Sequence, residues 1–311
     1  ELNHHNCHAS LAFYNSGFEK ALVVVIDRNG SIFFIDDNPV ARESESIFVC
    51  SYPDSITPIY KSFWLENAFK KDRSFINRTI KNFYPGTNVH LHNNYGIVKV
   101  YEAATTLINQ HPLENGKTMG LSAYGCYNEK NTLINKDGMI YSDYFSSINT
   151  KNFKEATCFA NFETDITNTL TQENYQLYAD KAKQVQTETQ DAALKMIKEY
   201  TELTNIKNVC VVGGYGLNVV ANAYYMQNLP DINFYFEPVA DDAGISVGAA
   251  MLKYRQLTKN KVPIQLKLGA SKVYDDVRMA AKCNPDSIFL DGMEGSTGAG
   301  PHIAAANTGI P

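Results

Sequence analysis

The chain has 311 residues, of which 44% are hydrophobic and 20% are charged, a composition typical of globular proteins. Its length predicts two domains, or one large domain with an added fragment. The formal net charge of −5 provides no basic surface, so we expect neither nucleic acid nor an anionic membrane as a partner. The longest apolar run, which starts at Ala21, is too short to cross a bilayer.

The first half of the chain is predicted to form mainly strands. Two β-branched runs, Ala21–Asp27 and residues 31–36, lie on either side of an Asn-Gly pair, and this arrangement predicts a hairpin. The other elements predicted here are a strand from Ser46, a helix from Gly96 that ends before Pro112, and a strand over Met139–Phe145.

The second half alternates between helices and strands. Tyr178–Thr204 is the longest helical pattern, and its apolar residues form one broad stripe. It is followed by a strand from Asn208, a helix over Leu217–Met226, a strand over Ile232–Val239 and a helix over Gly244–Leu257. This alternation after a run of strands predicts an α/β fold with a mixed sheet.

Six scattered cysteines without a C-x-x-C pair favour free thiols and a cytoplasmic location. The chain starts without Met, directly on a motif and without a signal-peptide pattern, so we expect upstream sequence to be missing.

A histidine cluster, HHNCHAS, opens the chain. On a helix, His4 and His8 would share one face, where two imidazoles can bind the same metal ion. Neutral imidazole suits Fe, Zn or Ni, and a carboxylate from elsewhere would complete the site. The spacing is equally compatible with a solvated N-terminal helix that binds no metal.

Two glycine-rich loops are candidates for anion binding. The segment GGYGLN, with Gly213, Gly214 and Asn218, follows a predicted strand and precedes a helix, where exposed N–H groups favour phosphate. In the second loop, Glu114–Gly125, Lys117 is a cation able to meet phosphate. Either loop can instead be a turn without a ligand. Asp241 and Asp242 precede a predicted helix, and one of them is expected to cap it.

Taken in order, HHxxHA, the strand ending in Asp27, GKTMGLSAYG, GGYGLN and the DAG segment at Asp242 resemble the O-carbamoyltransferases of nodulation-factor and antibiotic biosynthesis. These are related to the universal tRNA threonylcarbamoyl transferase. The resemblance covers about residues 1–260. It implies an actin/Hsp70/sugar-kinase-like fold with a mixed sheet and flanking helices, truncated at its N-terminus.

The resemblance also implies a reaction. A carbamoyl group would pass from carbamoyl-adenylate, made from ATP, to a hydroxyl of a small-molecule or sugar acceptor. By this resemblance, His4, His8 and Asp242 bind Fe²⁺ or another divalent metal. Gly213, Gly214 and Asn218 match the adenosine-contacting loop, and Lys117 lies in a loop facing the nucleotide. Because the family's carbamoyl-adenylate-forming domain is missing, that intermediate would come from a separate domain.

The last residues, 261–311, resemble a different protein, the flavin-binding barrel of glutamate synthase. From Val262 the sequence predicts a strand, a helix, a second strand and the loop EGSTGAG. This β-α-β unit is one fragment of a barrel, and alone it cannot enclose a cofactor.

Two other functions remain open. The chain can be a non-catalytic nucleotide- or metal-binding fragment that needs a partner chain. It can also be a flavin-related glutamate synthase fragment, although that interpretation explains only residues 261–311, the tail of the chain.

Overall fold

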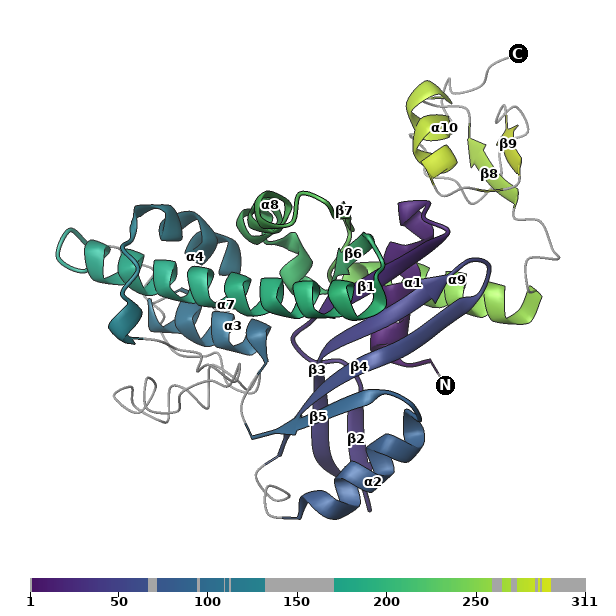
Figure 1. Cartoon of the computed structure of the whole chain (residues 1–311). Coiled ribbons are helices and arrows are strands. Elements are labelled where there is room, and N and C mark those ends of the chain that lie inside the picture. The colour runs from purple at the N-terminus through teal and green to yellow at the C-terminus, as the bar shows by residue number, and fades with distance from the viewer. Residues whose placement is uncertain are drawn as a thin grey trace.

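The computed structural model describes residues 2–66, 72–93, 96–108, 110–111, 113–131, 171–258, 265–269, 273–282, 285 and 287–291. A mixed seven-stranded sheet forms the centre, with helices against both faces (Figure 1). Its strands are β1 (Lys20–Ile26), β2 (Ile32–Ile35), β3 (Asn38–Ser51), β4 (Ser55–Leu65), β5 (Asn88–His92), β6 (Asn208–Val212) and β7 (Asn233–Phe236). The order is β5-β4-β3-β1-β6-β7, with β2 paired to β3. The predicted α/β architecture with a mixed sheet and flanking helices is confirmed.

The helices around the sheet are α1 (His4–Ser16), α2 (Arg73–Phe83), α3 (Ile97–Leu107), α4 (Asn115–Leu121), α7 (Tyr175–Thr204), α8 (Val219–Asn228) and α9 (Ile245–Thr258). The helix predicted from Leu217 begins instead at Val219, because Gly214–Leu217 form a 3₁₀ turn. The strand predicted over Met139–Phe145 lies outside the described residues. No helix in the described part of the chain has the length and apolarity that a membrane crossing requires.

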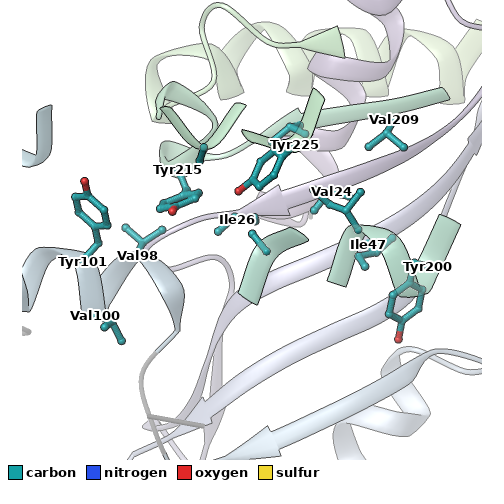
Figure 2. Close-up of a cluster of buried hydrophobic side chains, with 14 of the residues drawn as sticks. Val24, Ile26, Ile47, Val98, Val100, Tyr101, Tyr200, Val209, Tyr215 and Tyr225 are labelled. Carbon is teal, nitrogen blue, oxygen red and sulfur yellow. The ribbon is translucent and has the colours of Figure 1, made fainter. Parts of the chain in front are cut away.

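Strand β1 is central, and residues Ala21–Ile26 are buried on both of its faces. Leu22, Val24 and Ile26 face a core made with α3, α7 and α8, part of which Figure 2 shows around Tyr215 and Tyr225. Ala21, Val23 and Val25 pack with α1 on the opposite face. A continuous β-branched run suits this position because successive side chains of a strand point to opposite faces.

The predicted hairpin between β1 and β2 is wrong. Both strands pair antiparallel with β3, which is long enough to hold β2 at one end and β1 at the other. The turn that makes a hairpin is at Asp36 and Asp37, whose φ angles of 48° and 65° give the left-handed backbone that a two-residue hairpin requires. Gly30, from the Asn-Gly pair, donates its N–H to the carbonyl of Glu43 in β3.

The tail forms a separate small unit, in which β8 (Gln265–Gly269) and β9 (Ser287–Asp291) are parallel and α10 (Val273–Lys282) connects them. Figure 1 shows this unit set apart from the central sheet. The β-α-β order predicted from the sequence is confirmed, while the glycine-rich loop after β9 lies outside the described residues.

Candidate metal centre

The first turn of α1 carries the histidines. Asn3 caps the helix, since its side chain accepts a hydrogen bond from the N–H of Asn6 at 3.3 Å. The Asn3 amide in turn donates to the hydroxyls of Ser31 and Tyr84. The helix therefore starts at a fixed place, and His4 and His8 lie one turn apart on one face.

Four side chains converge at this face. Nε2 of His4 lies 3.2 Å from Nε2 of His8, 3.2 Å from Oδ1 of Asp242 and 3.3 Å from Oδ2 of Asp27. Nε2 of His8 lies 3.4 Å from the same Oδ1 of Asp242. One ligand atom from each of the four residues lies within 4.8 Å of the others. The structure therefore brings His4, His8 and Asp242 together, and it adds Asp27.

The spacing suits a single divalent metal. Bonds of about 2.0 to 2.2 Å place neighbouring ligand atoms roughly 3 to 3.5 Å apart around one ion. The His4–His8 nitrogen distance and the three nitrogen–oxygen distances given above fall in that range. Two imidazoles and two carboxylates form a donor set that suits Fe²⁺ and related ions. The residues fit the group, although metal binding itself remains a prediction.

The two carboxylates come from separate parts of the chain. Asp27 follows the last residue of β1, and sequence reasoning recorded it as part of a motif without assigning it to the site. Asp242 lies in a 3₁₀ turn just before α9. Its neighbour Asp241 accepts the N–H of Ala243 at 3.1 Å, so Asp241 caps this turn while Asp242 faces the histidines.

Without a metal, the contacts among these groups shift the pKa values of His4, Asp27 and Asp242. Burial opposes a charge on His4, but its contacts with Asp242 and Asp27 outweigh burial and raise its pKa to about 10. Burial also acts to raise the pKa of Asp27, but the contact with His4 prevails and the pKa is lowered. Contacts with His4 and then His8 hold the pKa of Asp242 well below its usual range. The metal-free cluster is therefore an ion-pair network centred on protonated His4.

His5 points elsewhere and does not join the cluster. It is fully buried, and its Nδ1 lies 2.7 Å from Oγ of Ser46 and 3.4 Å from Oε1 of Glu43. Glu43 also pairs with the buried amine of Lys61. This network connects the start of α1 to β3 and β4.

A cavity of about 460 Å³ opens beside the cluster. Asp27 and Asp242 line one part of it, α3 and the start of α4 contribute another wall, and the 3₁₀ turn at Gly214 contributes a third. This volume lies within the range of small-molecule sites, about 300 to 1,000 Å³.

The GGYGLN segment forms the predicted strand-to-helix turn, but the N–H groups of Gly213 and Gly214 do not face the cavity as free donors. Gly213 donates its N–H to the carbonyl of Ala240, and Gly214 donates to Oδ1 of Asp27 at 3.1 Å. Gly213 has a φ of 91°, and a Cβ there would meet the carbonyl oxygen of Ile26 at 2.4 Å, so this position requires glycine. Gly214 and Asn218 do line the cavity.

The side chain of Asn218 is committed to structure. Its Oδ1 caps α8 by accepting the N–H of Ala221, and its amide donates to Gln186 of α7. Gly214 and Asn218 therefore define the shape of the cavity wall, and the direct adenosine contacts implied by the resemblance remain a prediction.

Lys117 does not line the cavity. Its side chain is 55% exposed, and its amine pairs with Glu114 three residues earlier. The loop that carries Lys117 does reach the cavity, through Asn115, Gly116 and Met119, but the lysine side chain itself does not line it. Among the described residues, the basic side chain that lines the cavity is that of Arg28, which sequence reasoning passed over because it lies in the segment assigned to a hairpin turn.

Comparisons with known proteins place these features in a family. Residues 1–251 match the family described as the carbamoyltransferase N-terminus, and residues 246–311 match a conserved region in glutamate synthase. An uncharacterised protein of Synechocystis is 26% identical over 263 residues, which are 83% of this chain and 37% of the relative. A glutamate synthase large subunit-like protein of Rhizobium meliloti is 35% identical over 71 residues, which are 23% of this chain and 15% of the relative.

Two solved structures are also similar. Full-length HypF in its phosphate- and nucleotide-bound form matches with a TM-score of 0.46 and 14% identity, over 83% of this chain and 43% of HypF. HypF of T. kodakarensis matches with a TM-score of 0.49 and 13% identity, over 83% of this chain and 37% of its own. The chain thus spans less than half the length of each of these four proteins. Because the first family accounts for most of the residues, the chain belongs to the carbamoyltransferase family over residues 1–251 and carries a glutamate synthase region over residues 246–311.

Proposed function

We propose that this chain transfers a carbamoyl group from carbamoyl-adenylate to a hydroxyl of a small-molecule or sugar acceptor, with the help of a divalent metal, Fe²⁺ first. Membership of the carbamoyltransferase family supports carbamoyl transfer in general. The observation that carries the proposal is the cluster of His4, His8, Asp27 and Asp242 on the wall of a ligand-sized cavity. We also propose that the mixed sheet belongs to the actin/Hsp70/sugar-kinase-like class.

In this proposal the four side chains hold the metal, which supplies a Lewis acid that polarises the carbamoyl carbonyl. Nε2 of His4 must lose its proton before it can bind a metal, because only the neutral imidazole has a free lone pair. His8 and Asp27 are buried, which strengthens their electrostatic interactions, whereas the side chain of Asp242 is 68% exposed and leaves one side of the cluster open to solvent.

The group transfer itself is balanced without an oxidant or reductant. The acceptor oxygen forms a bond to the carbamoyl carbon as that carbon's bond to the phosphate oxygen breaks. AMP leaves with the electron pair of the broken bond, and the hydroxyl proton passes to solvent. We propose that a carbamoyl-adenylate-forming domain supplies this intermediate.

Metal binding tests the centre of the proposal. The His8→Ala variant should lower affinity for Fe²⁺ by more than about a hundredfold, because losing a direct ligand costs more than losing an outer-shell partner. His90→Ala removes an exposed histidine on β5 and is the matched control, which should bind Fe²⁺ as the unmodified chain does. Anaerobic titration measures both. Equal affinity in His8→Ala and His90→Ala would sink the metal site.

A transfer assay tests the reaction. The purified chain is mixed with a separately produced adenylating domain, ATP, labelled carbamoyl phosphate and a panel of aminoglycosides and oligosaccharides. Label transferred to an acceptor, and lost in His8→Ala, supports the proposal. Binding of metal and nucleotide without transfer to any acceptor would favour the alternative of a non-catalytic binding module.

A further inference from the structure

The cavity beside the metal cluster has an unusual balance of charge. Its described lining residues include four carboxylates, those of Asp27, Glu102, Asp241 and Asp242. Arg28 is the one positively charged side chain among the described residues that line it. An anionic ligand entering this cavity therefore depends on Arg28, together with any metal bound by the cluster.

Arg28 is held in place by a buried partner. Its Nε donates to Oε2 of Glu102 at 2.7 Å, and the side chains are only 15% and 3% exposed. Glu102 lies on α3, whereas Arg28 follows directly after Asp27 at the end of β1. The bond orients the planar guanidinium, a group suited to binding phosphate oxygens in pairs. Loss of either partner would leave a buried charge unpaired, so the pair keeps the guanidinium fixed on the cavity wall.

The chemistry of the proposed donor places a phosphate close to this arginine. In carbamoyl-adenylate a single oxygen joins the carbamoyl carbon to phosphorus. If the carbonyl is polarised at the cluster, the phosphoryl group must lie directly beside it. We infer that Arg28, oriented by Glu102, binds the phosphoryl group of the adenylate and so stabilises AMP as the leaving group. This inference rests on the proposed function and adds to it the residue that recognises phosphate.

Calorimetric titration of the full chain with AMP, adenosine and inorganic phosphate, in buffer containing a chelator, tests the assignment. The Arg28→Gln variant should bind AMP about 10- to 100-fold more weakly, the range expected for one hydrogen bond to a charged group. Its affinity for adenosine, which has no phosphate, should not change. Arg28→Lys keeps the charge but loses the planar guanidinium, so its affinity for AMP should lie between those of the unmodified chain and Arg28→Gln.

Lys117→Gln is the matched control. It removes the same charge from a nearby lysine that does not line the cavity, and it should leave AMP affinity unchanged. Because Arg28→Gln leaves the buried Glu102 without this ion pair, the double variant Arg28→Gln/Glu102→Gln provides a second chain in which both charges are removed. It should show the same loss for AMP, and urea unfolding confirms that each variant is folded.

Each outcome decides something. If Arg28→Gln binds AMP as tightly as the unmodified chain, the inference fails while the proposed function stands. An equal loss in Lys117→Gln would also overturn it, because the effect would then be one of general charge. If the unmodified chain binds neither AMP nor adenosine, the nucleotide part of the proposed function fails and the role of Arg28 fails with it.

Discussion

His4 sets the protonation state of the metal-free cluster. Its pKa of about 10 lies above the usual value of 6.5, so its stabilising contribution is fully present below pH 6.5 and is lost as the pH rises towards 10. The contributions of Asp27 and Asp242 have the opposite sign, because their pKa values are lowered. They are present above about pH 4 and are lost as the pH falls below it. Between these limits His4 carries a proton that a metal must displace.

Metal binding should therefore release a proton. Near pH 8 we expect about one proton per Fe²⁺ bound, because His4 is protonated in the metal-free chain and neutral in the metal-bound one. Anaerobic calorimetry in buffers with different ionisation enthalpies gives this number from the buffer dependence of the heat. The His90→Ala variant should release the same number. A heat at pH 8 that does not depend on the buffer would contradict the protonated state of His4.

At the level of single residues, the sequence predicted those that share a local motif. The spacing of His4 and His8 was sufficient to suggest a metal pair, and the DAG segment suggested Asp242. Asp27 and Arg28 could not be assigned in this way, because their positions depend on how the end of β1 lies against His4 of α1 and Glu102 of α3. The side chain of Lys117 lies away from the cavity for a local reason: Glu114, three residues earlier, pairs with it at the solvent-exposed side.

At the level of elements, the site depends on the packing of α1 against α9. Gly248 on α9 lies so close to α1 that a Cβ there would be 2.0 Å from the carbonyl oxygen of Cys7. Gly244, at the start of the same segment, is similarly close to Leu11. These glycines allow the two helices to approach closely. Since α1 carries the histidines and Asp242 immediately precedes α9, this approach sets the distance between the ligands.

Adding a methyl group at Gly248 should disturb the site from a distance. In Gly248→Ala the helices must separate, which we expect to cost about 1 to 3 kcal/mol of stability and to weaken Fe²⁺ binding about tenfold or more. Urea unfolding and anaerobic titration measure the two effects. The control is Gly120→Ala in α4, where a Cβ would meet nothing within 4 Å and the change should raise stability slightly. Unchanged metal affinity in Gly248→Ala would show that the helix spacing does not control the site.

The elements themselves were largely predictable, because each has a strong periodic pattern. The long helix α7 and the buried strands β1 and β6 follow from apolar spacing alone. The hairpin was mispredicted because an Asn-Gly pair signals a turn without saying which strands pair. The length of β3 and the turn at Asp36 and Asp37 decide the pairing, and both depend on sheet-wide contacts.

At the level of the whole molecule, the tail is nearly independent of the sheet. Of the side chains described on α10, only that of Ala280 is buried, while Tyr274 and Met279 on α10 and Phe289 on β9 are exposed. Residues 1–258, the front of the chain, and the tail both line a cavity of about 610 Å³. Leu266 and Pro285 come from the tail, and Tyr14 of α1 and Tyr254 of α9 are among the residues from the front. A unit with so little buried apolar surface gains little free energy to offset its ordering entropy of about 1 to 2 kcal/mol per residue.

Removing the tail should therefore leave the front almost unaffected. A chain ending at Thr258 keeps every strand of the large sheet and all four residues of the metal cluster. Its Tm should differ from that of the full chain by no more than about 2 °C, since a shift of this size corresponds to less than roughly 1 kcal/mol. Fe²⁺ affinity should be unchanged, and the purified full chain should show no visible flavin absorbance, because two strands cannot close a barrel around a cofactor. A large drop in Tm would mean that the tail packs firmly against α1 and α9. A yellow full-length protein that loses its colour on truncation would instead make the glutamate synthase region a working flavin site.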